Sequence, residues 1–72
     1  MARLATDIMA RIEWLTTRAR EYSVAKEAGD IEGLLRVAAE YATHEKTVAI
    51  STRIMLEVAV MRERQAAHEQ SR

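Results

Sequence analysis

Residues 48–61, VAISTRIMLEVAVM, form the longest dense apolar run in the chain and constrain its fold most strongly. Placed on a helix at about 100° per residue, the run has apolar side chains on two nearly opposite faces. One face gathers Val48, Thr52, Met55, Leu56 and Ala59, and the other gathers Ile50, Ile54, Val58 and Met61. A surface helix needs only one apolar stripe, whereas a helix that is apolar all round is buried on several sides. A chain of 72 residues is too short to surround such a helix, so the run predicts self-association or a partner.

The same run also fits a β-strand by local propensity. Its residues alternate with a period of two and include many β-branched side chains, a pattern typical of strands. However, the run is long for a strand, and no turn residues follow it to make a hairpin. We favour a helix and leave open a strand that pairs with another molecule.

A single turn divides the chain. There is no proline, and the two glycines lie close together at Gly29 and Gly33. Gly29 suits the left-handed position just after a helix, because it has no Cβ to clash there. Asp30 suits the N-cap of the next helix, where its carboxylate can accept a free backbone N–H. The sequence therefore predicts a helix end, a turn at residues 29–30 and a second helix.

Apolar spacing sets the extent of both helices. A first helix over residues 4–28 has a stripe at spacings of three and four, made of Leu4, Ile8, Ile12, Leu15, Ala19 and Tyr22. A second helix over residues 31–67 has an inner side made of Ile31, Leu34, Ala38, Tyr41, Val48, Ala49, Thr52, Met55, Leu56 and Ala59. Glu45 falls within that side, so a break near Thr43-His44 remains the alternative to one continuous helix. Residues 62–72 form a polar tail that should fray.

Helix length indicates where the chains would associate. At about 1.5 Å per residue, the first helix covers the second only to about residue 55. The side of the second helix that faces away is polar where it is covered and becomes apolar near the end of the first helix. We therefore expect an all-α, antiparallel two-helix hairpin, one domain over residues 1–72, that assembles with coiled-coil-like packing. The simplest assembly is a homodimeric four-helix bundle, with an oligomer interface at Ile50, Ile54, Val58 and Met61.

Composition excludes several partners. The 11 basic and 11 acidic residues cancel, so nothing predicts attraction to nucleic acid or an anionic membrane. There is no cysteine for a disulfide or a thiolate metal site. The run at residues 48–61 contains Arg53 and Glu57 and is shorter than the ~20 residues of a membrane span. No secretion signal is visible, and the expected location is the cytoplasm.

Trp14 is the strongest candidate for contacting a partner. It lies about 100° away from the stripe of the first helix, with Arg11 and Arg18 close by. Tryptophan and arginine are enriched in binding hot spots, so the three residues form a hypothetical partner-binding face. The alternative is a bundle-type RNA- or DNA-binding regulator that uses Arg11 and Arg18. Asp7 and Glu21 interrupt that face, and a solvated, salt-bridged surface is the simpler interpretation.

Metal binding and catalysis have little support in the sequence. Glu40 and His44 share a helix face, with Glu45 adjacent. Helical bundles combine such residues into metal sites, but the usual di-metal pattern needs a Glu-x-x-His pair, which this chain lacks. No serine has a convincing local base, and no glycine-rich phosphate loop occurs. We expect no catalytic site, cofactor or metal, and the chain is not expected to be an enzyme.

Residues 25–42, AKEAGDIEGLLRVAAEYA, resemble the turn of a tetratricopeptide-type helix pair. There is one such unit, whereas stable arrays need three or more. The order of a short helix, a Gly-Asp turn and a longer helix also looks like small type III secretion subunits and their co-chaperones. In shape alone, these resemblances imply a structural subunit, an adaptor or a co-chaperone.

Overall fold

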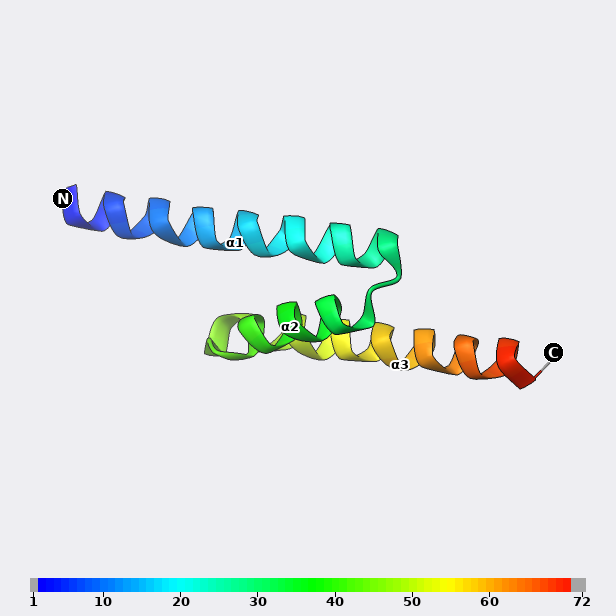
Figure 1. Ribbon diagram of the computed structural model, residues 1–72. Coiled ribbons are helices and arrows are strands. Elements are labelled where there is room, and N and C mark those ends of the chain that lie inside the picture. The colour runs from blue at the N-terminus through cyan, green and yellow to red at the C-terminus, as the bar shows by residue number, and fades with distance from the viewer. Residues whose placement is uncertain (1, 71–72) are drawn as a thin grey trace.

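The computed structural model describes residues 2–70, with side chains from residue 5 onward. Three α-helices, α1 (Ala2–Ala28), α2 (Ile31–Ala42) and α3 (Val48–Gln70), follow one another, and a 3₁₀ turn, η1 (Glu45–Thr47), precedes α3 (Figure 1). The all-α class is confirmed, and no strand occurs within residues 2–70. The strand alternative for residues 48–61 is therefore wrong, because that run lies within α3.

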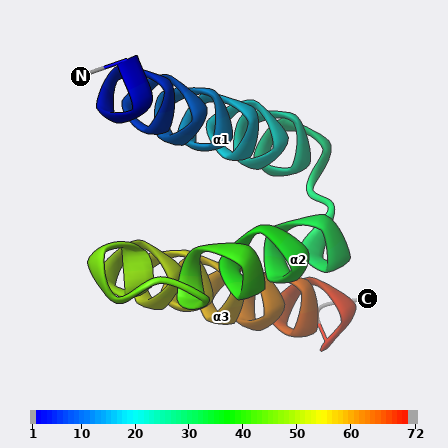
Figure 2. The ribbon, with the colours of Figure 1, turned by 90° about the vertical axis from the view of Figure 1, so that its left-hand side faces the viewer.

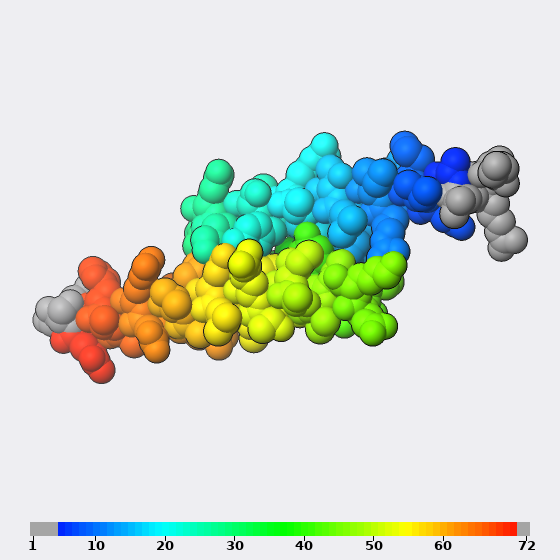
Figure 3. All heavy atoms as spheres, turned by 180° about the vertical axis from the view of Figure 1, so that it is seen from behind, coloured from blue at the N-terminus to red at the C-terminus, as the bar shows by residue number. Residues whose placement is uncertain are grey.

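The three helices form a long, thin molecule. The middle helix, α2, packs against both α1 and α3 (Figure 2). The N-terminal half of α1 extends past one end of α2, and the C-terminal half of α3 extends past the other end (Figures 1 and 3). The molecule measures 61 × 21 × 12 Å and has a radius of gyration of 15.6 Å. A compact domain of this length would have a radius of gyration of about 11 Å.

The turn between α1 and α2 confirms the prediction at Gly29 and Asp30. Gly29 has a positive φ of 66°, which a residue without Cβ adopts without strain. The Gly29 N–H donates to the Lys26 carbonyl (3.2 Å) and the Asp30 N–H donates to the Ala25 carbonyl (2.9 Å), as in a Schellman motif. The Asp30 carboxylate then accepts the Gly33 N–H at 3.0 Å and caps α2.

The prediction of one continuous helix over residues 31–67 is wrong. The chain leaves the helical conformation after Thr43, because His44 is extended, with φ −124° and ψ 133°. Thr47 is buried, and its hydroxyl donates to the carbonyl of Tyr41 in the last turn of α2. This bond satisfies a carbonyl that the helix end leaves without an intrahelical partner. The break considered at Thr43-His44 is thus present, and it turns α3 back along α2.

The expected polar tail is helical over most of its length. Although residues 62–70 are polar and exposed, they continue α3 to Gln70. Residues 71–72 lie outside the described residues. The last helix thus ends three residues beyond the predicted end at residue 67, and fraying of the tail stays a prediction.

The core lies where α2 packs against its two neighbours. Its buried side chains are Ala25, Leu34, Val37, Ala38, Tyr41, Ile54 and Val58. Leu34 and Val58 are the most enclosed of the large side chains, at 0% and 1% exposed. Because α2 has only 12 residues, it cannot cover the full length of either longer helix. The molecule therefore has a small core and long uncovered helix surfaces.

Candidate interaction surfaces

The two apolar faces of residues 48–61 are exchanged relative to the prediction: the face expected to lie outside is the buried one. Ile54 and Val58, assigned from sequence to the oligomer interface, are 3% and 1% exposed within the single chain. Met61 is half-buried beside them, and Ile50 is 42% exposed. The face assigned to the inside is the outer one, which we call the α3 stripe. It consists of Val48, Ala49, Thr52, Met55, Leu56, Ala59 and Val60, all exposed.

The reversal at residues 43–47 accounts for this exchange. In a continuous helix, the face shared with Leu34 and Tyr41 would include Val48 and Met55. Because α3 instead folds back over α2, Ile54 and Val58 are the side chains of this run that join Leu34 and Val37 in the buried core. The α3 stripe is thereby left uncovered, with Leu56 the most exposed of its large side chains at 65%.

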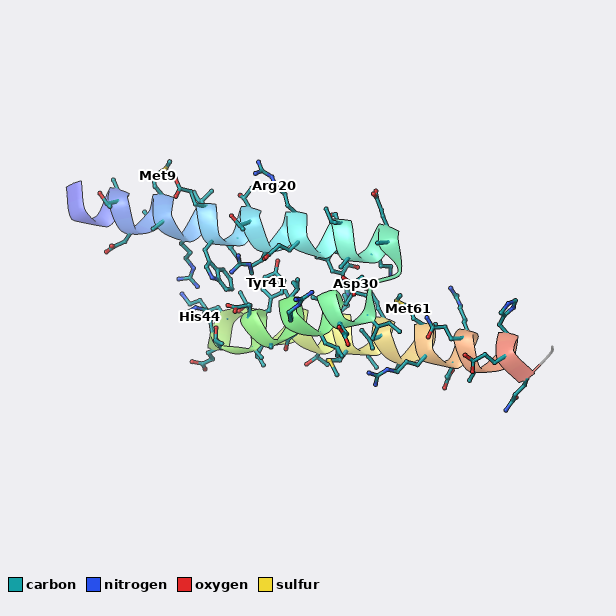
Figure 4. The ribbon with its side chains drawn as sticks, viewed as in Figure 1. Met9, Arg20, Asp30, Tyr41, His44 and Met61 are labelled. Atoms are coloured by element: carbon teal, nitrogen blue, oxygen red, sulfur yellow. The ribbon has the colours of Figure 1, made fainter. Side chains whose placement is uncertain are left out.

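A second apolar surface lies on the N-terminal half of α1. Ile8, Met9 and Ile12 are 51–56% exposed, and Figure 4 shows Met9 pointing away from α2. We call these three residues the α1 patch. The sequence placed Ile8 and Ile12 on the packed stripe, whereas Leu15 and Tyr22 are the members of that stripe that pack against the core. Here Asp7, Arg11 and Trp14 are among the side chains of α1 that share a groove with His44 and Thr47, so the patch lies on the faces of α1 that are turned away from that groove.

Trp14 faces α2 rather than solvent. Its ring makes edge contacts with Tyr41 (5.7 Å between ring centroids) and His44 (5.2 Å), both of which lie below α1 in Figure 4. The guanidinium of Arg18 lies 5.5 Å from the centroid of the Trp14 ring, within the range of a cation–π interaction. Trp14 is therefore half-buried and joins α1 to the C-terminal end of α2.

The predicted partner-binding residues are divided by this packing. Trp14 and Arg11 line a groove of about 360 Å³, together with Asp7, Ala10, Leu15, His44 and Thr47. Arg18 does not line this groove; its side chain is only 18% exposed. Arg18 pairs with Glu21 and lies 3.8 Å from the Glu40 carboxylate. Arg18 is thus engaged within the chain, and Arg11 is the arginine of the pair that borders the groove.

A polar cluster connects α1 directly to α3. The Tyr22 hydroxyl donates to Glu57 Oε2 at 2.5 Å, and Lys26 Nζ lies 3.2 Å from the same oxygen. The hydrogen bond from Tyr22, opposed by desolvation and assisted by Lys26, lowers the pKa of Glu57 below its ordinary value. The same bond raises the pKa of Tyr22, with desolvation adding to the effect. Burial also raises the pKa of Tyr41. Sequence reasoning missed this cluster because its members are 35 residues apart.

Replacing Tyr22 with phenylalanine should lower the free energy of unfolding at pH 7 by about 1 kcal/mol, the typical net value of one hydrogen bond. Because the bond lowers the pKa of Glu57 in the folded state, its contribution is present above the ordinary value of 4.5 and is lost as the pH falls through the lowered value. Urea unfolding of both proteins from pH 3 to pH 8 measures this. A stability difference that is the same at pH 3 and pH 7 would show that the Tyr22 hydroxyl does not act through the charged Glu57 carboxylate.

The residues considered for metal binding make other contacts in the structure. The Glu40 carboxylate lies close to the guanidinium of Arg18, and the His44 ring packs against Trp14. Within residues 2–70, no three His, Asp or Glu side chains converge in a way that could hold a metal ion. A surface hollow of about 680 Å³ lies between α1 and α2 and has charges of both signs around it, including Arg18, Glu21, Arg36 and Glu40.

In the described residues, no helix has both the length and the apolar character needed to cross a membrane. Comparison of the chain with protein-family models, curated proteins and solved structures found no match.

Proposed function

We propose that this chain is a small helical protein-interaction module that functions when bound to other protein chains, as a structural subunit, an adaptor or a co-chaperone. The main support is the amount of surface that it exposes. The chain has an accessible surface of 5858 Å². A compact monomer of 8.2 kDa would have about 4500 Å². The chain therefore exposes about 1300 Å² more than a protein of its size that functions alone.

The chemistry of the excess surface supports the same function. Apolar side chains on the surface are ordinary when scattered, but contiguous patches mark interaction sites. The α3 stripe and the α1 patch are two separate surfaces. Each consists of neighbouring apolar side chains on one regular helix. An apolar helix face of this kind is one of the recurring surfaces by which proteins recognise other helices.

The nucleic-acid alternative has weaker support. It requires Arg11 and Arg18 to present their charges together, and Arg18 is engaged with Trp14, Glu21 and Glu40. The net charge of the chain is zero, whereas nucleic-acid affinity depends on cationic side chains that neutralise phosphates.

Site-specific photo-cross-linking in cells that express the chain tests the proposed function. A benzophenone side chain in place of Met55, on the α3 stripe, should give protein adducts after irradiation. The control replaces Arg20, an exposed polar position on α1, and should give few adducts. Equal labelling at both positions, or none at either, would contradict a role in protein interaction.

A further inference from the structure

We infer that the α3 stripe is a self-association surface, and that its occupant is the α3 stripe of a second copy of this chain. This inference rests on the proposed function and identifies the partner of one of its surfaces. It differs from the interface expected from sequence, because Ile54 and Val58 are buried within the single chain.

The charge distribution of α3 suits pairing with itself. Every side chain of the α3 stripe is uncharged over residues 48–60, a length of about 18 Å on a helix. In a symmetric dimer, the same patch of surface lies on both sides of the interface, so a charged group in it would face a like charge. Glu57 lies on another face and is held by Tyr22 and Lys26, whereas Arg53 borders the stripe beside Leu56 and Val60. The middle of the stripe is therefore uncharged, and its one neighbouring charge over residues 48–60 outside that polar cluster lies at the edge.

The shape of the stripe suits close helix packing. Larger side chains at Val48, Met55, Leu56 and Val60 alternate with smaller ones at Ala49, Thr52 and Ala59. Two helices approach most closely where the ridges of one fit the grooves of the other. The stripe offers both ridges and grooves, so a second copy can supply the complementary surface.

The exposed area of the whole chain leaves room for a dimer. The chain has about 1300 Å² more accessible surface than a compact protein of its mass, and a stable interface of standard size buries about 800 Å² on each partner. The excess, summed over the whole chain, is therefore larger than the area that one such interface covers on each copy. Pairing of two α3 stripes leaves the α1 patch and the Trp14 groove free for a different partner.

Light scattering on the purified full chain and two variants tests the inference. Leu56→Lys places a charge in the α3 stripe, and Val24→Lys places the same charge on α1, outside the stripe. The two positions are matched, being 65% and 68% exposed, and lysine is a good helix former. We expect the unmodified chain and Val24→Lys to have twice the 8.2 kDa mass of one chain. Leu56→Lys should weaken dimerisation at least about 100-fold, because both copies carry the charge. Its circular dichroism per residue should show retained helix.

Two results would overturn the inference. A monomeric unmodified chain at millimolar concentration would show that the stripe does not pair with itself. Adducts to a different protein at position 55 would then leave the proposed function intact, so the two failures are distinguishable. A Leu56→Lys chain that dimerises as strongly as Val24→Lys would place self-association on another surface.

Discussion

Ile54→Asp is expected to abolish the folded state, whereas Ile50→Asp, one turn earlier on the same helix, should leave it intact. Ile54 is 3% exposed and belongs to the core, and Ile50 is 42% exposed. Removing the Ile54 side chain costs about 2–5 kcal/mol, and an unpaired buried carboxylate adds several more. The total is at least comparable with the stability of about 5 kcal/mol expected for so small a domain.

Circular dichroism and urea unfolding distinguish the two variants. Ile50→Asp should lower the free energy of unfolding by only about 1 kcal/mol, the usual effect of a partly exposed substitution. The loss stays small because an aspartate in the first turn of α3 interacts favourably with the helix dipole. Both residues belong to the oligomer interface expected from sequence. In that arrangement, the two substitutions would have similar effects on the fold. Equal losses of helix in the two variants would contradict the position of Ile54 in the core.

Trp14→Ala should destabilise the chain by about 2–3 kcal/mol, somewhat less than a fully buried tryptophan would. The substitution removes the edge contacts with Tyr41 and His44 and the cation–π contact with Arg18. These contacts anchor α1 beside the end of α2, so we expect α1 to lose order from its N-terminus to about this position. Amide hydrogen exchange measures that loss residue by residue.

Trp14→Phe is the matched control, because it keeps an aromatic ring of smaller size in the same contact. It should retain most of the protection in α1. If Trp14→Ala leaves exchange in α1 unchanged, Trp14 is a surface residue, as its angular position on the helix suggests, and its role is confined to partner binding.

The turn at Gly29 and Asp30 is the feature that sequence predicts most completely. Its determinants are local: a residue that tolerates positive φ and a carboxylate that reaches its own helix N-terminus. Both requirements are visible in adjacent letters of the sequence. The all-α class is equally accessible, because apolar spacing and the absence of proline extend over the whole chain.

The reversal before α3 is harder to predict, because its determinants are spread along the chain. The Thr47 hydroxyl donates to a carbonyl six residues earlier, and no glycine or proline marks the break. Glu45 is the one residue whose position in the sequence indicated a break, because it interrupts the apolar side of a continuous helix. Its exposure in the structure agrees with the principle that a carboxylate without a partner avoids burial.

The two faces of residues 48–61 illustrate how one such break changes a functional prediction. Sequence correctly shows that the run is apolar on both sides, and the single chain indeed covers only one of them. Which side is covered depends on the direction of α3 relative to α2. That direction is set by the conformation of His44 and Thr47, and no periodicity within residues 48–61 reports it.

The outward position of the α3 stripe depends on α3 folding back over α2, and a distance within one chain tests this most directly. The chain contains no cysteine, so spin labels can be attached at Glu32→Cys and Arg62→Cys and measured by pulsed electron paramagnetic resonance. Diluting the labelled chain with unlabelled chain restricts the signal to distances within one molecule. Since packed helix axes lie about 8–10 Å apart, the folded-back arrangement should give a label distance below about 25 Å. A distance near 45 Å, the length of about 30 helical residues, would show a continuous second helix and would return Ile50, Ile54, Val58 and Met61 to the outer face.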